Sequence, residues 1–292
     1  MKAWAPVIVL AALLAWWLWP RTIERPESPP VAESVVERPP EPAAAPVIVA
    51  PVPVPRATSG EPPRPPKGTI SYRLVDGLLI SYGDVMIGKP TSADVAEQGF
   101  VALPKTGRWP GKEIAYALHQ DLQNPERVMA AIAYFNENTE VRFVPLKEGQ
   151  ADSIVFAPTN IPLCLSYVGR VGGHQPIYLD DRCSEREIVH EIMHALGFIH
   201  EHSRPDRDNY ITVRWNNIEP DRHSQFEIAP EELSGPMKDR PFDYNSIMIY
   251  EDTLFGRVRG DITLESRTDQ KVKPVEFGLS PEDLERLKRL YR

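Results

Sequence analysis

Residues 190–201 read His190-Glu191-Ile192-Met193-His194-Ala195-Leu196-Gly197-Phe198-Ile199-His200-Glu201. Residues four apart lie on one face of a helix, so His190 and His194 can offer two imidazole nitrogens to a single ion. Glu191 stands one position further round the helix, beside that ion, where a general base is needed. The spacing therefore predicts a zinc-binding helix that also carries a catalytic carboxylate.

The sequence also indicates where this helix begins and ends. Ser184 and Glu187 have the spacing of a capping box, and apolar residues at helical spacing follow them. Gly197 tolerates the left-handed backbone conformation that ends a helix and turns the chain. On a continuous helix His200 could not reach the ion that His194 binds. We therefore expect the break at Gly197 to return His200 to the metal.

The surrounding sequence resembles one family. The pattern H-E-x-x-H-x-x-G-x-x-H is that of the metzincins, and Glu201 follows the third histidine as it does in their astacin branch. Three segments carry the closer resemblance: 200–210 (His-Glu-His-Ser-Arg-Pro-Asp-Arg-Asp-Asn-Tyr), 243–250 (Asp-Tyr-Asn-Ser-Ile-Met-Ile-Tyr) and 164–170 (Cys-Leu-Ser-Tyr-Val-Gly-Arg). From about Trp109 to Arg292 the chain thus resembles the astacin family of zinc metalloproteases.

The resemblance implies a zinc-dependent endopeptidase with one Zn²⁺ in the catalytic domain. The implied metal ligands are His190, His194, His200 and Tyr250. Glu191 is implied to be the general base that takes a proton from the attacking water, and Tyr250 to help stabilise the oxyanion. Met248 is implied to form an apolar floor in a Met-turn. The strand Leu165–Val168 is implied to be the cleft edge on which an extended peptide substrate pairs.

The chain has two cysteines, Cys164 and Cys183. In the family a disulfide lies ahead of the zinc helix, and the resemblance implies that these two residues form it. The family's second disulfide is missing, because Glu140 and Arg292 stand in the regions of its cysteines. A loop of this size would contribute about 3 kcal/mol in the chain-entropy model. A disulfide also implies an oxidising compartment.

The segment 69–101 resembles the tail of an astacin propeptide. Within it, residues 78–88 are expected to form a strand, a turn and a strand. In the family a Gly-Asp pair places its carboxylate on the zinc and displaces the catalytic water, which makes Asp84 the candidate latency residue. The alternative is that Gly83 and Asp84 form an ordinary turn between two strands.

The family also suggests how such a chain is activated. A cut in the pro-segment creates a new N-terminus that enters the fold and pairs with the glutamate after the third histidine, here Glu201. Matching the spacing to Trp109 places the expected cut near 99–103.

The N-terminal part indicates export. A leading Lys2 and an apolar run over 3–19 predict a signal anchor or a signal peptide at 1–20, and the favoured alternative is an uncleaved anchor. Residues 21–68 are expected to form an extended linker, because 20–68 holds 15 of the 31 prolines and the linker has no aromatic residue. We expect a bacterial-type protein, either periplasmic or on the cell surface, and bound to the membrane rather than freely secreted.

The remaining residues, 102–292, are long enough for one catalytic domain. Strands are expected around 114–118, 141–144, 154–156, 165–168 and 177–179. One helix is expected after Asn124, with Val128, Met129, Ile132 and Phe135 buried, and a second after Ser280, with Leu284, Leu287, Leu290 and Tyr291 buried. Helices and strands do not alternate regularly, so the class is α+β: a metzincin-like, two-subdomain zinc protease with a mixed sheet. The net charge of −8 includes no basic cluster, which argues against a nucleic-acid partner.

Two other functions remain open. One is a zinc-containing pseudo-protease that binds peptides without cutting them, although Glu191 argues for turnover. The other is a metal-dependent amidase acting on cell-wall peptides, which the metal-binding pattern alone would allow. A cleavage assay on protein substrates separates these alternatives from an endopeptidase.

Overall fold

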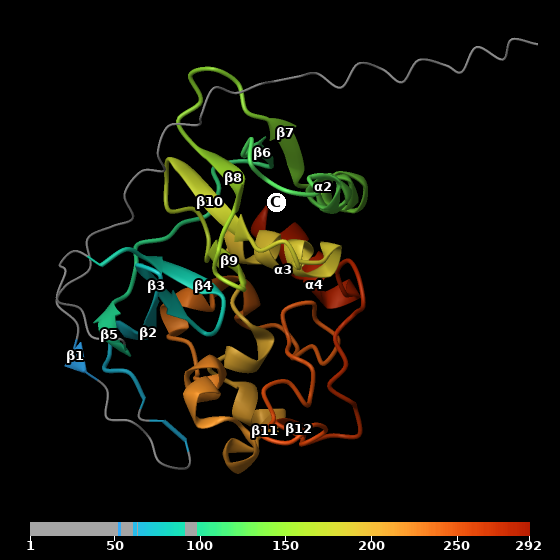
Figure 1. Cartoon of the computed structure of the whole chain (residues 1–292). Coiled ribbons are helices and arrows are strands. Elements are labelled where there is room, and N and C mark those ends of the chain that lie inside the picture. Colours follow the sequence, from blue (N-terminus) through green and yellow to red (C-terminus); the bar gives the residue numbers. More distant parts are fainter. Residues whose placement is uncertain (1–51, 54–60, 63, 91–97) are drawn as a thin grey trace, which may run out of the picture. The chain divides into compact units, whose positions relative to one another are not determined.

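The computed structural model describes residues 52–53, 61–62, 64–90 and 98–292 (Figure 1). The predicted signal or anchor segment and most of the predicted linker lie outside the described residues. The described part contains one large mixed sheet with a few helices packed against it, so the prediction of an α+β fold is confirmed. No helix among the described residues has both the length and the apolar character needed to cross a bilayer.

Ten strands of the described part form one sheet in the order β1-β5-β2-β3-β4-β9-β10-β8-β6-β7. Their bounds are β1 Val52–Pro53, β2 Thr69–Val75, β3 Leu78–Ser81, β4 Val85–Gly88, β5 Gln98–Ala102, β6 Glu113–Leu118, β7 Arg142–Pro145, β8 Ser153–Pro158, β9 Cys164–Tyr167 and β10 His174–Leu179. From β10 to β7 all pairs are parallel, whereas β9 pairs with β10 in the antiparallel direction. The expected strands of the catalytic domain are therefore present. In the sheet order, β9 is the catalytic-domain strand that lies next to the N-terminal strands.

The remaining strands of this sheet, β1 to β5, lie before residue 103, and we call the described residues up to Ala102 the N-terminal segment. Strands β2, β3 and β5 pair as antiparallel neighbours, and β4 joins them to the catalytic domain by pairing with β9 in the parallel direction. The predicted strand-turn-strand at 78–88 is confirmed as β3, a turn and β4. The expected cut region at 99–103 falls on and just after β5, which pairs with β2 along its whole length.

Helices α2 (Glu126–Asn138) and α3 (Glu185–Ala195) pack together against the sheet, and α4 (Pro281–Leu290) ends the chain beside them (Figure 1). Two details of α2 were predicted wrongly. Asn124 does not cap the helix, because it adopts a left-handed conformation with φ of 50° and Pro125 takes the cap position. Met129 is not buried: it is 43% exposed, and its sulfur accepts a hydrogen bond from the hydroxyl of Tyr116.

The chain after α3 forms a second, irregular subdomain with its own small core. It contains the short strands β11 (Ile211–Val213) and β12 (Leu264–Ser266), which pair with each other. Its 3₁₀ helices cover Glu201–Ser203, Arg207–Asn209, Trp215–Asn217, Pro220–Phe226, Glu231–Leu233 and Gly235–Met237. The larger core lies between the sheet and the three α-helices, and α3 contributes to it along one whole face. The zinc-binding pattern therefore sits on a helix that is held rigidly by packing.

Candidate metal and catalytic site

The predicted zinc helix is α3, and its ends lie where the sequence indicates. The capping box is confirmed: the Ser184 side chain accepts from the Glu187 backbone, and the Glu187 carboxylate accepts from the Ser184 backbone. The helix stops before Gly197, which has φ of +111°. The turn is closed by the Phe198 N–H, which donates to the carbonyl of Met193. The chain then doubles back and carries His200 toward the helix.

The structure brings four side chains to one point. The Nε2 atoms of His194 and His200 each lie 3.3 Å from a carboxylate oxygen of Asp84, and that of His190 lies 3.6 Å away. The two Nε2 atoms of His190 and His200 are 3.1 Å apart. One ligand atom from each of the four residues can be chosen so that all lie within 4.8 Å of one another. Among the described residues this is the one such group.

The group fits a zinc ion. The Nδ1–H of His190 donates to the carbonyl of Ile247 at 2.8 Å, and that of His194 to the carbonyl of Phe198 at 2.7 Å. These bonds fix the tautomer, so the lone pair of each Nε2 faces the common point. Burial lowers the pKa of His194, and it lowers the pKa of His200 to about 4, which keeps both rings neutral as metal binding requires. His194 Nε2 and one oxygen of Asp84 are buried and have no hydrogen-bond partner in the protein.

Glu191 lies on the same helix and is 2% exposed. One of its carboxylate oxygens is buried without a hydrogen-bond partner. Burial raises the pKa of this carboxyl well above its usual range, and the charge of Asp84 adds to that effect. A carboxylate in such an environment binds a proton readily, which is the property that a general base needs.

The Met-turn residues lie beside this group. Met248 is fully buried, and its carbonyl accepts a hydrogen bond from the Glu201 N–H at 2.8 Å. The ring of Tyr250 lies 4.8 Å from that of His200, measured between centroids. Its hydroxyl donates to the carbonyl of Tyr82 at 2.9 Å, so in the intact chain the N-terminal segment holds this hydroxyl.

His202 is a buried residue to which the sequence analysis gives no role. Its ring stacks on that of His200 at a centroid distance of 4.9 Å and lies tilted against that of Tyr250 at 4.0 Å, so the three rings contact one another. Burial lowers its pKa well below the usual range, so the ring is neutral. Its Nε2 lies 3.2 Å from the carbonyl of Gln225, to which it donates, and its Nδ1 accepts from the Tyr250 N–H at 3.4 Å. His202 therefore positions Tyr250, and only its place beside His200 in the motif could have suggested this.

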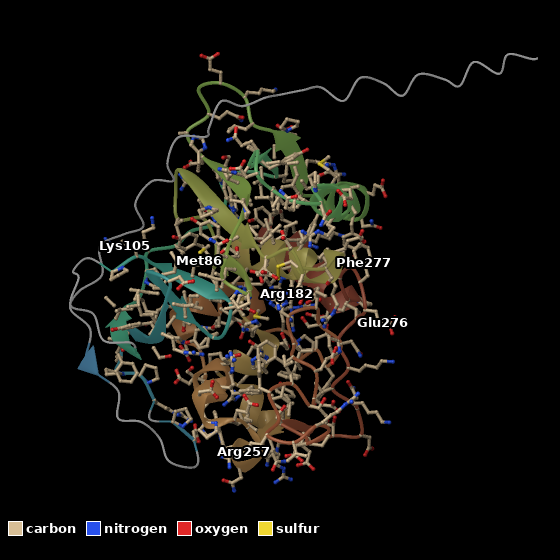
Figure 2. The ribbon with its side chains drawn as sticks, viewed as in Figure 1. Met86, Lys105, Arg182, Arg257, Glu276 and Phe277 are labelled. Carbon is tan, nitrogen blue, oxygen red and sulfur yellow. A yellow bond between two sulfur atoms is a disulfide. The ribbon has the colours of Figure 1, made fainter. Side chains whose placement is uncertain are left out.

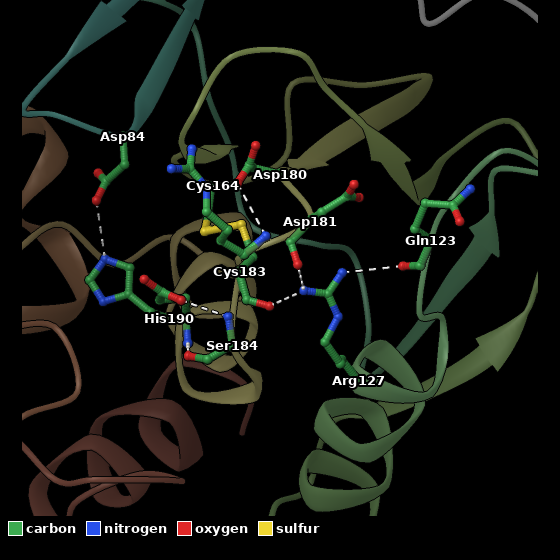
Figure 3. Close-up of a disulfide and its surroundings, with 11 residues drawn as sticks. Asp84, Gln123, Arg127, Cys164, Asp180, Asp181, Cys183, Ser184 and His190 are labelled. Carbon is green, nitrogen blue, oxygen red and sulfur yellow. Dashed lines mark hydrogen bonds and ion pairs between the residues drawn. A yellow bond between two sulfur atoms is a disulfide. The ribbon is translucent and has the colours of Figure 1, made fainter.

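Cys164 and Cys183 form a disulfide whose Cα atoms are 6.0 Å apart. Cys164 begins β9, and Cys183 precedes the capping residue of α3. Figure 3 shows the bond at the start of this helix, with Asp84 and His190 in the same view. Nearby, the Arg127 guanidinium donates to the carbonyl of Asp181 at 2.8 Å and also to that of Cys183. The Cys164–Cys183 disulfide therefore joins β9, the predicted cleft edge, to the start of the zinc helix α3.

A cavity of about 520 Å³ opens in front of Asp84, His190 and Glu191. Its lining comes from three parts of the chain: Gly83 and Asp84 from the N-terminal segment, Leu163, Cys164, Arg182 and Glu187 from the subdomain of the large sheet, and Ile249, Tyr250 and Leu254 from the irregular subdomain. Figure 2 shows Arg182, one of the lining residues, near the middle of the molecule between the two subdomains. The site thus lies in a cleft between subdomains, and the N-terminal segment enters that cleft.

The fold and the site together define an α+β protein with a three-histidine metal group and a buried carboxylate on a capped helix. The model of the astacin family (peptidase family M12A) matches residues 102–292, and the chain belongs to this family. Zinc is therefore the metal that this group binds.

Known proteins of this kind are similar over most of the chain. Zinc metalloproteinase nas-14 of Caenorhabditis elegans is 35% identical over 231 residues, which is 77% of this chain and 44% of that protein. Tolloid-like protein 1 of Mus musculus is 33% identical over 80% of this chain and 25% of its own length. The solved structure of high choriolytic enzyme 1, a hatching-enzyme zinc protease of Oryzias latipes, superposes with a TM-score of 0.56. It is 29% identical and covers 64% of this chain and 93% of its own. The chain thus spans less than half the length of nas-14 and of Tolloid-like protein 1.

Proposed function

We propose that this protein is a zinc-dependent endopeptidase that cuts peptide or protein substrates bound in an extended conformation. The observation that carries the proposal is the convergence of three histidines with Glu191 in a cleft. Membership of the astacin family and the similarity to named zinc metalloproteinases support it.

Zinc, when bound by the three imidazoles, supplies a Lewis acid that acidifies water and polarises a carbonyl. Glu191 takes the proton of the attacking water and hands it to the leaving amine. Tyr250 can direct its hydroxyl to the developing oxyanion once it is released from Tyr82. The Ile247 and Phe198 carbonyls keep His190 and His194 in the orientation that binding requires. The edge of β9 that β4 now occupies is the place where an extended substrate pairs once the N-terminal segment has left.

We also propose that the N-terminal segment keeps the intact chain latent, by three contacts. Asp84 places its carboxylate among the three histidines. Strand β4 pairs with β9, with Val85 beside Ser166, and so occupies the edge that a substrate needs. The Tyr82 carbonyl holds the hydroxyl of Tyr250. The Gly-Asp pair is thus a turn whose carboxylate also faces the site. Only glycine fits beside Asp84, because a Cβ at Gly83 would lie 2.6 Å from the Tyr250 hydroxyl.

The domain division that we propose follows from this arrangement. Residues 69–101 act as the pro-segment and 102–292 as the catalytic domain, preceded by a linker at 21–68 and a signal or anchor segment at 1–20. Export to an oxidising compartment agrees with the Cys164–Cys183 disulfide. An N-terminal anchor would hold the protease at a membrane.

The proposal is tested on the uncut, zinc-loaded full chain. Wild type is expected to be nearly inactive on a short fluorogenic peptide, and Asp84→Ala to gain activity on it at least tenfold, with mass spectrometry confirming that neither chain has been cut. The matched control is Asp76→Ala, an exposed aspartate in the preceding turn of the same segment, which should stay as inactive as wild type. Adding Glu191→Gln to Asp84→Ala should abolish hydrolysis and keep the zinc.

The outcomes separate the candidate functions. Equal activity of uncut wild type and Asp84→Ala on the short peptide would remove Asp84 from the latency mechanism. Zinc binding without protein cleavage, in Asp84→Ala and also in the cut chain, would indicate a peptide-binding pseudo-protease. Cleavage confined to cell-wall peptides would indicate the amidase.

A further inference from the structure

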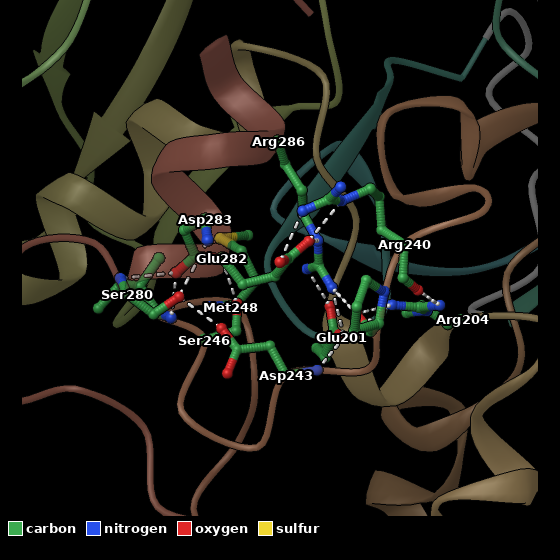
Figure 4. Close-up of polar contacts among 12 residues, drawn as sticks. Glu201, Arg204, Arg240, Asp243, Ser246, Met248, Ser280, Glu282, Asp283 and Arg286 are labelled. Atoms are coloured by element: carbon green, nitrogen blue, oxygen red, sulfur yellow. Dashed lines mark hydrogen bonds and ion pairs between the residues drawn. The ribbon is translucent and has the colours of Figure 1, made fainter. Parts of the chain in front are cut away.

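The carboxylate of Glu201 is fully buried and receives hydrogen bonds from four N–H groups (Figure 4). One oxygen accepts from Arg204 at 2.9 Å, from the Asp243 N–H at 2.7 Å and from Arg286 at 3.0 Å. The other oxygen accepts from a second nitrogen of Arg286 at 2.6 Å. Arg286 and Glu201 are both 0% exposed, and they form a two-point pair. Three of the four donors meet one oxygen, and Arg286 is the residue that binds both oxygens of the carboxylate.

Glu201 is joined to the metal group through the backbone. It directly follows His200, and its N–H donates to the carbonyl of Met248 at 2.8 Å, which links the third histidine to the Met-turn. Because Arg286 lies on α4, its pairing with Glu201 fixes this link from the C-terminal helix.

A second bond from α4 reaches another histidine. The Asp283 carboxylate accepts from the Ser246 hydroxyl at 2.7 Å and from the Ile247 N–H at 2.8 Å. The carbonyl of Ile247 in turn accepts from Nδ1 of His190 at 2.8 Å. Two neighbouring turns of α4 therefore hold two different histidines of the site, each through the Met-turn region.

We propose that Arg286 is a positioning residue for the metal site: through its two-point pair with Glu201 it holds the third histidine against the Met-turn. The inference rests on the proposed function and deepens it, because it names a residue outside the metal group that fixes the geometry of that group.

The test measures zinc affinity in the full chain by competition with a chelator, together with the visible absorption spectrum of the Co²⁺-loaded protein. Arg286→Met is expected to weaken zinc binding 10- to 100-fold and to change the cobalt spectrum, as loss of an outer residue that orients a ligand does. Arg286→Lys, which keeps the charge and loses the two-point geometry, should recover part of the affinity. Arg240→Met is the matched control, since Arg240 pairs with Glu282 on the same helix. It should stay within twofold of wild type.

If Arg286→Met does not fold, the double variant Glu201→Gln/Arg286→Met is measured in its place, because it removes both charges of the buried Arg286–Glu201 pair. Weakened zinc binding and an altered spectrum are again expected. Zinc affinity within twofold of wild type, in whichever of the two variants folds, would overturn the positioning role.

The same measurements separate this inference from the proposed function, because zinc affinity is read without hydrolysis. Zinc results as expected for the Arg286 variants, with no hydrolysis of any peptide by the cut wild-type chain, would refute the proposed protease function alone.

Discussion

The contact between Ser71 of β2 and Glu227 of the second subdomain predicts an unusual dependence of stability on pH. The Ser71 hydroxyl donates to the Glu227 carboxyl, and both residues are buried, at 5% and 7% exposed. Burial raises the pKa of Glu227 to about 7, although Ser71 and the nearby Arg207 partly oppose this. This carboxyl therefore loses its proton near neutral pH while it lies under the N-terminal segment.

The magnitude follows from linkage. The carboxyl has a pKa near 4.5 in the unfolded chain and about 7 in the folded chain, so between these values the folded state holds the extra proton. Stability then falls as the pH rises from about 4.5 to about 7, and the full difference is about 3 kcal/mol. Glu227→Gln stays neutral and can still accept from Ser71. It should match wild type near pH 4.5 and exceed its stability by about 3 kcal/mol at pH 8.

The assay is denaturant unfolding of the zinc-loaded full chain, followed by tryptophan fluorescence at several pH values between 4.5 and 8. The difference between variant and wild type isolates this carboxyl, because contributions common to both chains cancel. Glu231→Gln changes an exposed carboxylate four residues away and should show no such trend. A difference between Glu227→Gln and wild type that stayed constant over the whole pH range would refute the reasoning.

Two further predictions concern the metal ligands and the disulfide. His200→Ala should lose zinc, whereas Tyr250→Phe should keep it and lose rate, because three imidazoles still bind the ion; equal loss of zinc in both, measured by metal analysis, would contradict the assigned roles. Replacing both Cys164 and Cys183 with serine should lower the free energy of unfolding by about 3 kcal/mol, measured by denaturant titration, and a loss below about 0.5 kcal/mol would show that the loop is held by other contacts.

The zinc helix could be predicted from sequence because its signals are local. The capping box at Ser184, the four-residue histidine spacing and the helix-ending Gly197 each depend on backbone geometry within a few residues. The strand over Glu113–Leu118 could be predicted for a similar reason, since the alternation of Ile114, Tyr116 and Leu118 is a local signal. Such signals do not depend on which distant segment finally covers them.

The interactions behind the site could not be predicted, because they join residues far apart in the chain. Apolar spacing in α4 identifies Leu287 as a core residue, yet it gives no sign that Asp283 and Arg286 are fully buried beside it. Their burial depends on partners 36 and 85 residues away, Ile247 and Glu201. Charged residues on a helix normally face solvent, and only the tertiary structure shows that these two face the Met-turn region.

The three contacts of the N-terminal segment with the cleft differ in what a single substitution can remove. Asp84→Ala frees the common point of the three histidines, but β4 still pairs with β9 and the Tyr82 carbonyl still holds Tyr250. A long substrate therefore meets a blocked edge even in this variant, whereas a short peptide that needs little strand pairing can reach Glu191. Uncut Asp84→Ala should accordingly regain a larger share of the cut enzyme's activity on a short fluorogenic peptide than on a folded protein. Equal shares on the two substrates would mean that the carboxylate alone enforces latency and that the pairing of β4 with β9 contributes nothing to it.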